Sequence, residues 1–201
     1  MKYKKTEAFA KNLDKMDKLA KHRNDFFHPK DNNKNELIYF AGNSLGLQPK
    51  KVSKYLTKEL SMWSQKGVLG QEERWIGYHE KLTDSTAKLV GALPTEVVVM
   101  NALTVNIHLL LISFYQPNKA KHKVIIEKDA FPSDHYAVQS QIKLHGFDPK
   151  QALIELNPRE GEKILRHEDI ISTIESHRDE IALIYLGGVN YYTGQSFDLK
   201  E

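Results

Sequence analysis

The chain has 201 residues, of which 40% are hydrophobic and 27% charged, proportions typical of a globular protein rather than a disordered one. It contains no cysteine, which excludes a disulfide framework, a zinc site with cysteine ligands and a cysteine nucleophile. The net charge of +3 comes from residues 1–30, where nine Lys or Arg stand against four Asp or Glu. Such a mixed run indicates a solvated helix face rather than a nucleic-acid site. With no apolar run long enough for a membrane span or a signal peptide, we expect a cytoplasmic protein without membrane or nucleic-acid partners.

The first half of the chain is predicted to be mainly helical. Apolar residues at helical spacing predict an amphipathic helix over roughly residues 6–27 and a second helix that starts near Pro49 and ends at Gly67. Residues 67–78 contain three glycines and are predicted to form a loop. A third helix is expected over about 79–91, with its apolar side chains facing inward: Leu82, Leu89 and Val90.

Beyond Pro94 the pattern alternates between short β-branched runs and helical segments. We predict strands at residues 97–100, 124–126, 152–156 and 181–186, and helices over 104–115, 132–145 and 168–177. This order favours βαβ units, in which parallel strands are continuous apolar runs buried on both sides. The fold class predicted is therefore α/β, a mostly parallel sheet with helices on both faces.

Ligands in an open α/β sheet bind beyond the carboxyl ends of the strands, and the residues that follow three of the predicted strands are unusually polar. Thr104 starts a helix and could help to hold a phosphate, or could simply cap that helix. Phe131 could stack on a flat ligand beside Asp134, or the segment could be a helix start with a hydrophobic staple. The glycines of residues 187–194 could let the backbone come close to a ligand, or the tyrosines of this segment could pack beneath the sheet edge. Nucleotide-binding motifs and histidine pairs at metal-ligand spacing are absent from the sequence.

Several of these segments together resemble one family, kynureninase. They are AGNSLGLQP (41–49), VVVMNALTVNIHLLL (97–111), AFPSDHYAVQSQ (130–141), LHG (144–146) and GVNYYTGQ (188–195). The resemblance implies the N-terminal part of a homodimeric fold-type-I enzyme that depends on pyridoxal 5′-phosphate. The family hydrolyses the Cβ–Cγ bond of L-kynurenine, or 3-hydroxykynurenine, to anthranilate, or 3-hydroxyanthranilate, and L-alanine. This reaction serves tryptophan catabolism and NAD biosynthesis.

The resemblance also implies roles for residues at matching positions. Leu103 and Thr104 are expected to hold the cofactor phosphate, and Phe131 to stack on its ring. Asn43 and Ser44 are expected near the polar end of the substrate. Gln71 stands where the family commonly has a histidine close to the aryl ring. The residues that are expected to complete the cofactor wall are Pro132, Ser133 and Asp134.

Family members are roughly twice as long as this chain, so the resemblance implies an arm over residues 1–36 and an incomplete cofactor-binding domain over 37–201. The Schiff-base lysine and the D-x-A-H motif would lie beyond Glu201. We therefore expect no catalytic residue in these 201 residues and no turnover of kynurenine by the chain alone. Alternatives are another fold-type-I enzyme such as a cysteine desulfurase-like lyase, and a non-catalytic remnant that dimerises or binds the cofactor weakly.

Overall fold

The computed structural model describes residues 3–198 and 200 of the chain. The chain divides into two compact units, Met1–Leu82 and Thr83–Glu201, called unit 1 and unit 2 below. The arm predicted over residues 1–36 and the domain predicted over 37–201 stay predictions. Their boundaries were inferred from a longer family of proteins, and the two units are defined by contacts within this chain.

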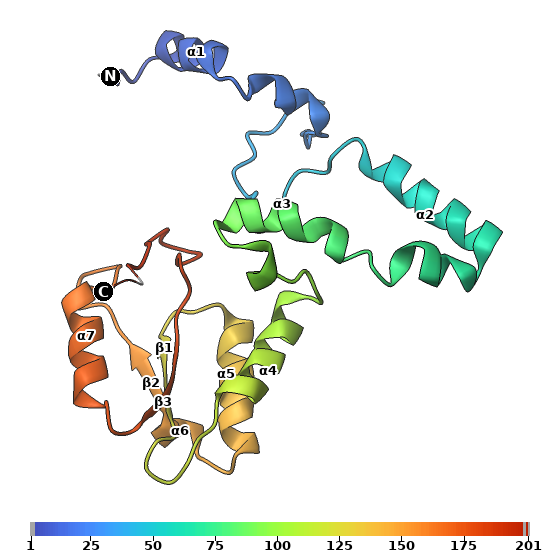
Figure 1. The fold of residues 1–201 in the computed structure, drawn as a ribbon. Helices are drawn as coiled ribbons and strands as arrows, with labels where there is room; N and C mark the ends of the chain where they lie inside the picture. The colour runs from blue at the N-terminus through green and yellow to red at the C-terminus, as the bar shows by residue number, and fades with distance from the viewer. Residues whose placement is uncertain (1–2, 199, 201) are drawn as a thin grey trace. The chain divides into compact units, whose positions relative to one another are not determined.

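Unit 1 is helical (Figure 1), and its first helix is shorter than predicted. The single helix expected over residues 6–27 is wrong: the structure has α1 (Glu7–Met16) followed by the 3-10 turn η1 (Ala20–Asp25). The Asp17 side chain accepts a hydrogen bond of 2.8 Å from the backbone N–H of Leu19, which competes with continuation of the helix. The second predicted helix is confirmed as α2 (Val52–Lys66), which Gly67 caps with a φ of 53°, but it starts after Pro49 rather than at it.

The loop predicted over residues 67–78 is wrong, because part of it is the π-helical turn η2 (Gln71–Trp75). The Arg74 guanidinium donates to both carboxylate oxygens of Glu59 on α2, at 2.8 and 2.9 Å from its Nε. The Trp75 indole N–H donates to the same carboxylate at 2.9 Å. These bonds lower the pKa of Glu59 to about 2, and they tie the turn to α2 despite the neighbouring glycines.

The third predicted helix is confirmed as α3 (Glu80–Val90), which crosses the boundary between the units. Its predicted inward face is wrong. Leu89 and Val90 are 87% and 65% exposed, and Leu82 is 42% exposed. The residue that α3 buries is the small Ala87, so within the described residues this helix packs through a narrower stripe than its sequence suggests.

Unit 2 is an α/β domain around a three-stranded parallel sheet of the described residues, in the order β2-β1-β3. The predicted fold class is therefore confirmed. In chain order its elements are η3 (Pro94–Glu96), α4 (Leu103–Phe114), β1 (Lys123–Glu127), α5 (Pro132–Leu144), α6 (Pro149–Ala152), β2 (Leu153–Leu156), α7 (His167–Ser176) and β3 (Ile181–Tyr185). Neither the turn η3 nor the short α6 was predicted, and Ala152, the last residue of α6, was expected to start the strand over 152–156.

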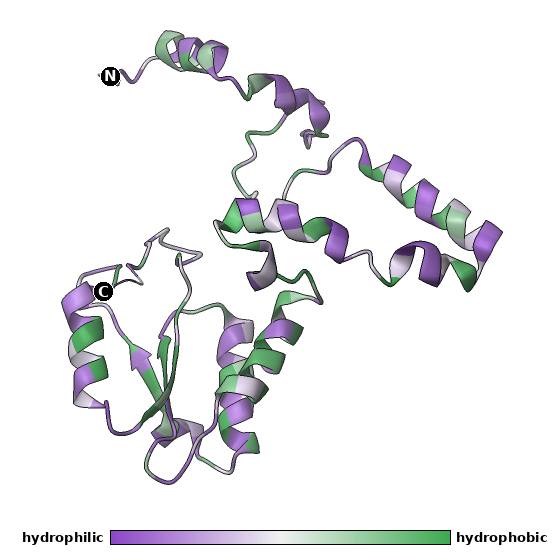
Figure 2. Cartoon of the chain, viewed as in Figure 1, coloured by the Kyte–Doolittle hydropathy of each residue, from purple (hydrophilic) through white to green (hydrophobic). Residues whose placement is uncertain are grey.

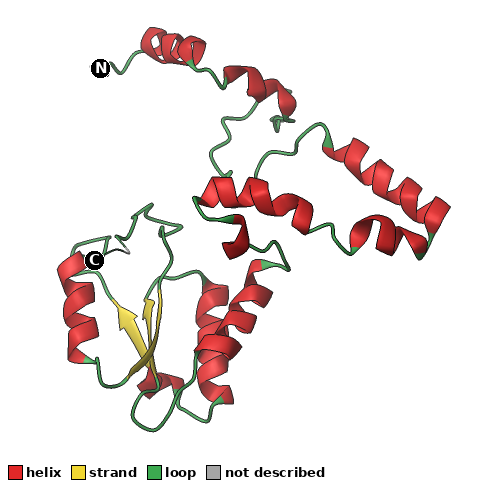
Figure 3. Cartoon of the chain, in the orientation of Figure 1, coloured by secondary structure: helices red, strands yellow, loops and turns green. Residues whose placement is uncertain are grey.

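The central strand β1 has a core on each of its faces, because successive side chains of a strand point to opposite sides. Val124 and Ile126 pack in a cluster with α4 and α5, whereas Ile125 packs with Ile170 of α7 on the other face. Figure 3 shows the strands between these helices, and in Figure 2 the sheet and α4 are largely hydrophobic. Both layers hold β1 in place, and with it the residues that follow the strand.

The strand predicted at residues 97–100 is wrong. This segment lies outside the sheet, and Val98 is 62% exposed. A β-branched run forms a strand only when a neighbour satisfies its backbone groups. The sheet of the described residues has β2 and β3 as its edges, and residues 97–100 pair with neither.

An ion-pair cluster at the start of β3 predicts a pH dependence of unit 2. Glu180 accepts from Lys123 and His177, each at 2.9 Å, which lowers its pKa from 4.5 to about 2. A carboxylate with a depressed folded pKa stabilises the fold above its unfolded pKa, and this contribution is lost as the pH falls from about 4.5 to about 2. Urea unfolding between these pH values is expected to show a shallower loss of stability for Glu180→Gln than for the unchanged chain. Parallel pH profiles of the two proteins would contradict this.

Candidate functional site

Two helices of unit 2 begin at the end of the sheet where β1 ends (Figure 1). β1 leads through a short turn into α5, and α4 packs alongside α5. The unpaired N–H groups of a helix's first turn carry a partial positive charge. Two such ends close together therefore favour an anionic group at this edge of the sheet.

The start of α4 leaves its first N–H groups uncapped by a side chain. Ala102 is the N-cap residue and has no side chain that could accept a hydrogen bond. Thr104 is the second residue of the helix, so it does not cap α4, which was the alternative reading of this threonine. Both Leu103 and Thr104 are exposed, and the Leu103 side chain is 71% exposed. The N–H groups and the Thr104 hydroxyl are thus open to a ligand.

The start of α5 presents an aromatic ring beside a carboxylate. Phe131 is the N-cap residue of α5 and is 53% exposed, and Pro132 follows at the first helical position. No side chain caps this end: the Ser133 hydroxyl instead approaches Asp134 at 3.4 Å. Burial, together with the nearby negative charge of Asp134, raises the pKa of Tyr185 at the end of β3 to about 12. The predicted residues 131–134 thus meet the end of a second strand.

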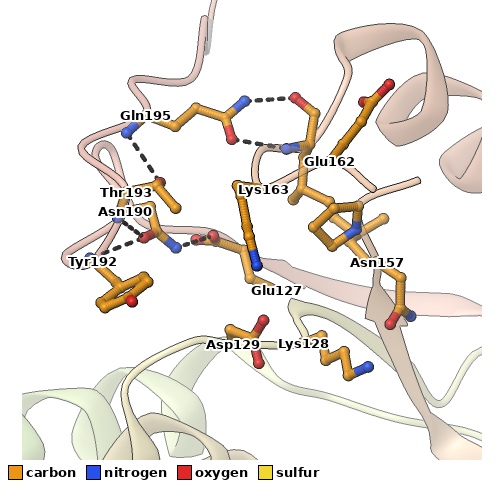
Figure 4. A pocket seen from close by; sticks show the side chains of 13 residues that line it. Glu127, Lys128, Asp129, Asn157, Glu162, Lys163, Asn190, Tyr192, Thr193 and Gln195 are labelled. Carbon is orange, nitrogen blue, oxygen red and sulfur yellow. Dashed lines mark hydrogen bonds between the residues drawn. The ribbon is translucent and has the colours of Figure 1, made fainter. Parts of the chain in front are cut away.

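The loop that follows β3 is held by a buried pair. Glu127, the last residue of β1, is 8% exposed and accepts 2.7 Å from the side-chain amide of Asn190 (Figure 4). The Asn190 side-chain oxygen accepts from the N–H groups of Tyr192 and Thr193, both at 2.9 Å. The next residue, Tyr191, meets Phe131 edge-on at 5.3 Å between ring centroids.

A cleft of about 310 Å³ opens beside this pair, at the carboxyl ends of β1 and β2. Figure 4 shows Lys163 extending from the loop after β2 toward Glu127. Gln195 and Leu165 also line the cleft. The Gln195 side chain accepts from the Leu165 N–H at 2.9 Å and donates to the Leu165 carbonyl at 2.6 Å, which ties the loop after β3 to the loop after β2. Both loops are therefore anchored around the cleft.

Two histidines near the site have structural partners. His135 Nε2 lies 3.0 and 2.8 Å from the carbonyls of Glu127 and Lys128, so it caps the end of β1. The partly buried His108 accepts at its Nδ1 from the Gln141 side chain at 3.2 Å. No cluster of His, Cys, Asp or Glu suited to a metal ion occurs among the residues that the structure describes.

The remaining predicted residues lie in unit 1. Asn43 and Ser44 are exposed in a turn that the Ser44 N–H closes onto the Ala41 carbonyl at 3.0 Å. Gln71 is the exposed first residue of η2. The roles that the resemblance implies for these residues stay predictions.

In the described part of the chain, no helix is both long and apolar enough to span a membrane.

Sequence reasoning missed the contributions of Glu127, Tyr185, Asn190 and Gln195. Glu127 and Tyr185 end strands, and Asn190 and Gln195 lie in or just after a glycine-rich loop that was singled out for its backbone. The available signal was an acidic residue closing an otherwise apolar strand, since a buried carboxylate requires a partner. Which partner it takes could not be read from the sequence, because Glu127 and Asn190 are 63 residues apart.

The chain is similar over nearly its whole length to curated kynureninases. That of Myxococcus xanthus is 50% identical over 200 residues, covering 98% of this chain and 47% of the relative. That of Koribacter versatilis is 52% identical over 199 residues, with 98% and 47% covered, and that of Mus musculus is 44% identical over 207 residues, with 96% and 45% covered. No protein-family model matches the chain. The chain spans about half the length of the curated relatives it matches, and the resemblance to kynureninase is confirmed.

Proposed function

We propose that this chain supplies the cofactor-binding wall of a kynureninase. The enzyme would use pyridoxal 5′-phosphate and water to cleave L-kynurenine, or 3-hydroxykynurenine, at its Cβ–Cγ bond. The products are anthranilate, or its 3-hydroxy form, and L-alanine. The observation that carries the proposal is 50% identity to the Myxococcus xanthus kynureninase over 98% of this chain.

The start of α4 fits the phosphate of the cofactor. Its first N–H groups have no side-chain cap, and Leu103 and Thr104 are exposed there. Backbone N–H groups of these two residues and the Thr104 hydroxyl would donate hydrogen bonds to phosphate oxygens. The adjoining start of α5, which also lacks a side-chain cap, adds to the positive potential.

The start of α5 fits the ring of the cofactor. Phe131 keeps half of its surface free for stacking, and Ser133 and Asp134 offer polar groups beside it. Bound pyridoxal phosphate would supply an electron-withdrawing ring that stabilises negative charge developing on the amino-acid substrate. The chain's own part is to hold the ring flat against Phe131, with Pro132 fixing the backbone at the helix start. Binding of the substrate by Asn43 and Ser44, and assembly as a homodimer, are further parts of the proposal.

A direct binding measurement tests this proposal. We expect the chain to bind 4′-deoxypyridoxine 5′-phosphate, which lacks the aldehyde and so cannot react with surface lysines. Inorganic phosphate should compete, because both ligands would use the start of α4. Phe131→Ala is expected to weaken the affinity for the analogue about tenfold through lost stacking.

The matched control is Phe114→Ala, since Phe114 is 68% exposed at the opposite end of α4. This variant should bind the analogue as the unchanged chain does. Equal losses in both phenylalanine variants, or binding that phosphate does not displace, would contradict the proposed site.

A further inference from the structure

The buried pair Glu127–Asn190 joins two segments that the chain brings together from far apart. Glu127 closes β1, and Asn190 lies in the loop after β3. Both residues are more than nine-tenths buried, and 2.7 Å separates the Glu127 carboxylate oxygen from the Asn190 amide nitrogen. A hydrogen bond to a buried carboxylate is strong, and its loss leaves a charge without a partner.

Asn190 is also the centre of its own loop. Its side-chain oxygen accepts from Tyr192 and Thr193, its N–H donates to the Gln195 carbonyl at 2.8 Å, and its carbonyl accepts from Gly194 at 3.0 Å. Gly194 has a φ of 73°, which lets the chain return along itself. These hydrogen bonds tie the conformation of the loop to the position of Asn190.

The residue that this arrangement places is Tyr191. Its ring stands edge-on to Phe131, with 5.3 Å between centroids and 81° between planes. Phe131 is 53% exposed at the start of α5, and Tyr191 is the aromatic ring described in contact with it. An aromatic neighbour in this T-shaped arrangement favours one orientation of the Phe131 ring.

We propose that Glu127 and Asn190 are positioning residues that hold Tyr191 against Phe131, and so fix the face on which a planar cofactor ring stacks. This inference rests on the proposed function for its ligand. The contact between the two rings, however, is a property of the chain without ligand. The two parts can therefore be tested separately.

Reversing the pair provides the test. Asn190→Asp sets two carboxylates against each other and removes the amide donor, while keeping an oxygen for Tyr192 and Thr193. Adding Glu127→Gln restores a hydrogen bond with donor and acceptor exchanged. Asn157→Asp is the matched control, because Asn157 lines the same cleft but bonds only to the nearby Glu155 carbonyl among the contacts described.

The first measurement is the nuclear Overhauser contact between the Tyr191 and Phe131 rings in the ligand-free chain. We expect Asn190→Asp to lose this contact and the double variant to regain it. The second is binding of 4′-deoxypyridoxine 5′-phosphate, expected to weaken about tenfold in Asn190→Asp and to recover in the double variant. Affinity for inorganic phosphate should stay within about twofold throughout, since the start of α4 is unchanged.

The ring contact decides the inference even if the analogue does not bind. An Asn190→Asp variant that keeps the contact and the affinity would overturn it. So would a folded double variant, judged by circular dichroism, that regains neither. Failure of the unchanged chain to bind the analogue would instead overturn the proposed function, while the Overhauser contacts would still report on the pair.

Discussion

Ile126→Ala is expected to destabilise unit 2 by about 2–5 kcal/mol, because it opens a cavity in a close-packed core. Ile126 lies on the central strand β1, is 0% exposed and packs against helices α4 and α5. It also directly precedes Glu127, so loosening the strand end should loosen the Asn190 loop. A loss of this size is a large fraction of the 5–15 kcal/mol that typically stabilises a domain. The measurement is the midpoint of urea unfolding.

The control for this prediction is Ile112→Ala on α4, where Ile112 is 54% exposed. A surface substitution of this kind usually changes stability by no more than about 0.5 kcal/mol. If both variants lowered the midpoint equally, α4 and β1 would not pack as the structure has them. An Ile126→Ala chain as stable as the unchanged protein would contradict the core itself.

The part of the fold that could be predicted from sequence is the part that buries apolar runs. The runs at 124–126, 152–156 and 181–186 became strands because each found a parallel neighbour and a helix to cover it. Residues 97–100 carry the same pattern but have no paired strand among the described residues. The pattern reports what a segment can bury, whereas pairing depends on partners remote in the sequence.

Local side-chain bonds explain the other differences. The Asp17 side chain accepts from the Leu19 N–H at the end of α1, which favours termination of the helix. The Glu59 carboxylate accepts from Arg74 and Trp75, which lie 15 and 16 residues further along the chain, and so holds the turn η2. Helical periodicity contains no information on either bond. Predictions from periodicity therefore hold for an amphipathic segment such as α2. They fail where the hydrogen bonds of one polar side chain determine where a helix ends or how a turn folds.

The candidate site likewise contains residues that the sequence predicted and residues that only the structure revealed. Thr104, Phe131 and Asp134 were identified because each follows a predicted strand and has a side chain suited to a ligand. Glu127 and Asn190 escaped notice because their importance lies in a contact across 63 residues. The sequence motifs therefore predicted the groups that are proposed to face a ligand, and the structure was needed to find the buried groups behind them.

The most direct test of the central claim is a chimera in which this chain replaces the matched 200 residues of the Myxococcus xanthus kynureninase. With L-kynurenine and pyridoxal phosphate, the release of fluorescent anthranilate reports hydrolysis. We predict that the chimera releases anthranilate, that Phe131→Ala lowers the rate at least about tenfold through lost cofactor stacking, and that Phe114→Ala does not. A chimera that melts cooperatively but releases no anthranilate would contradict the account.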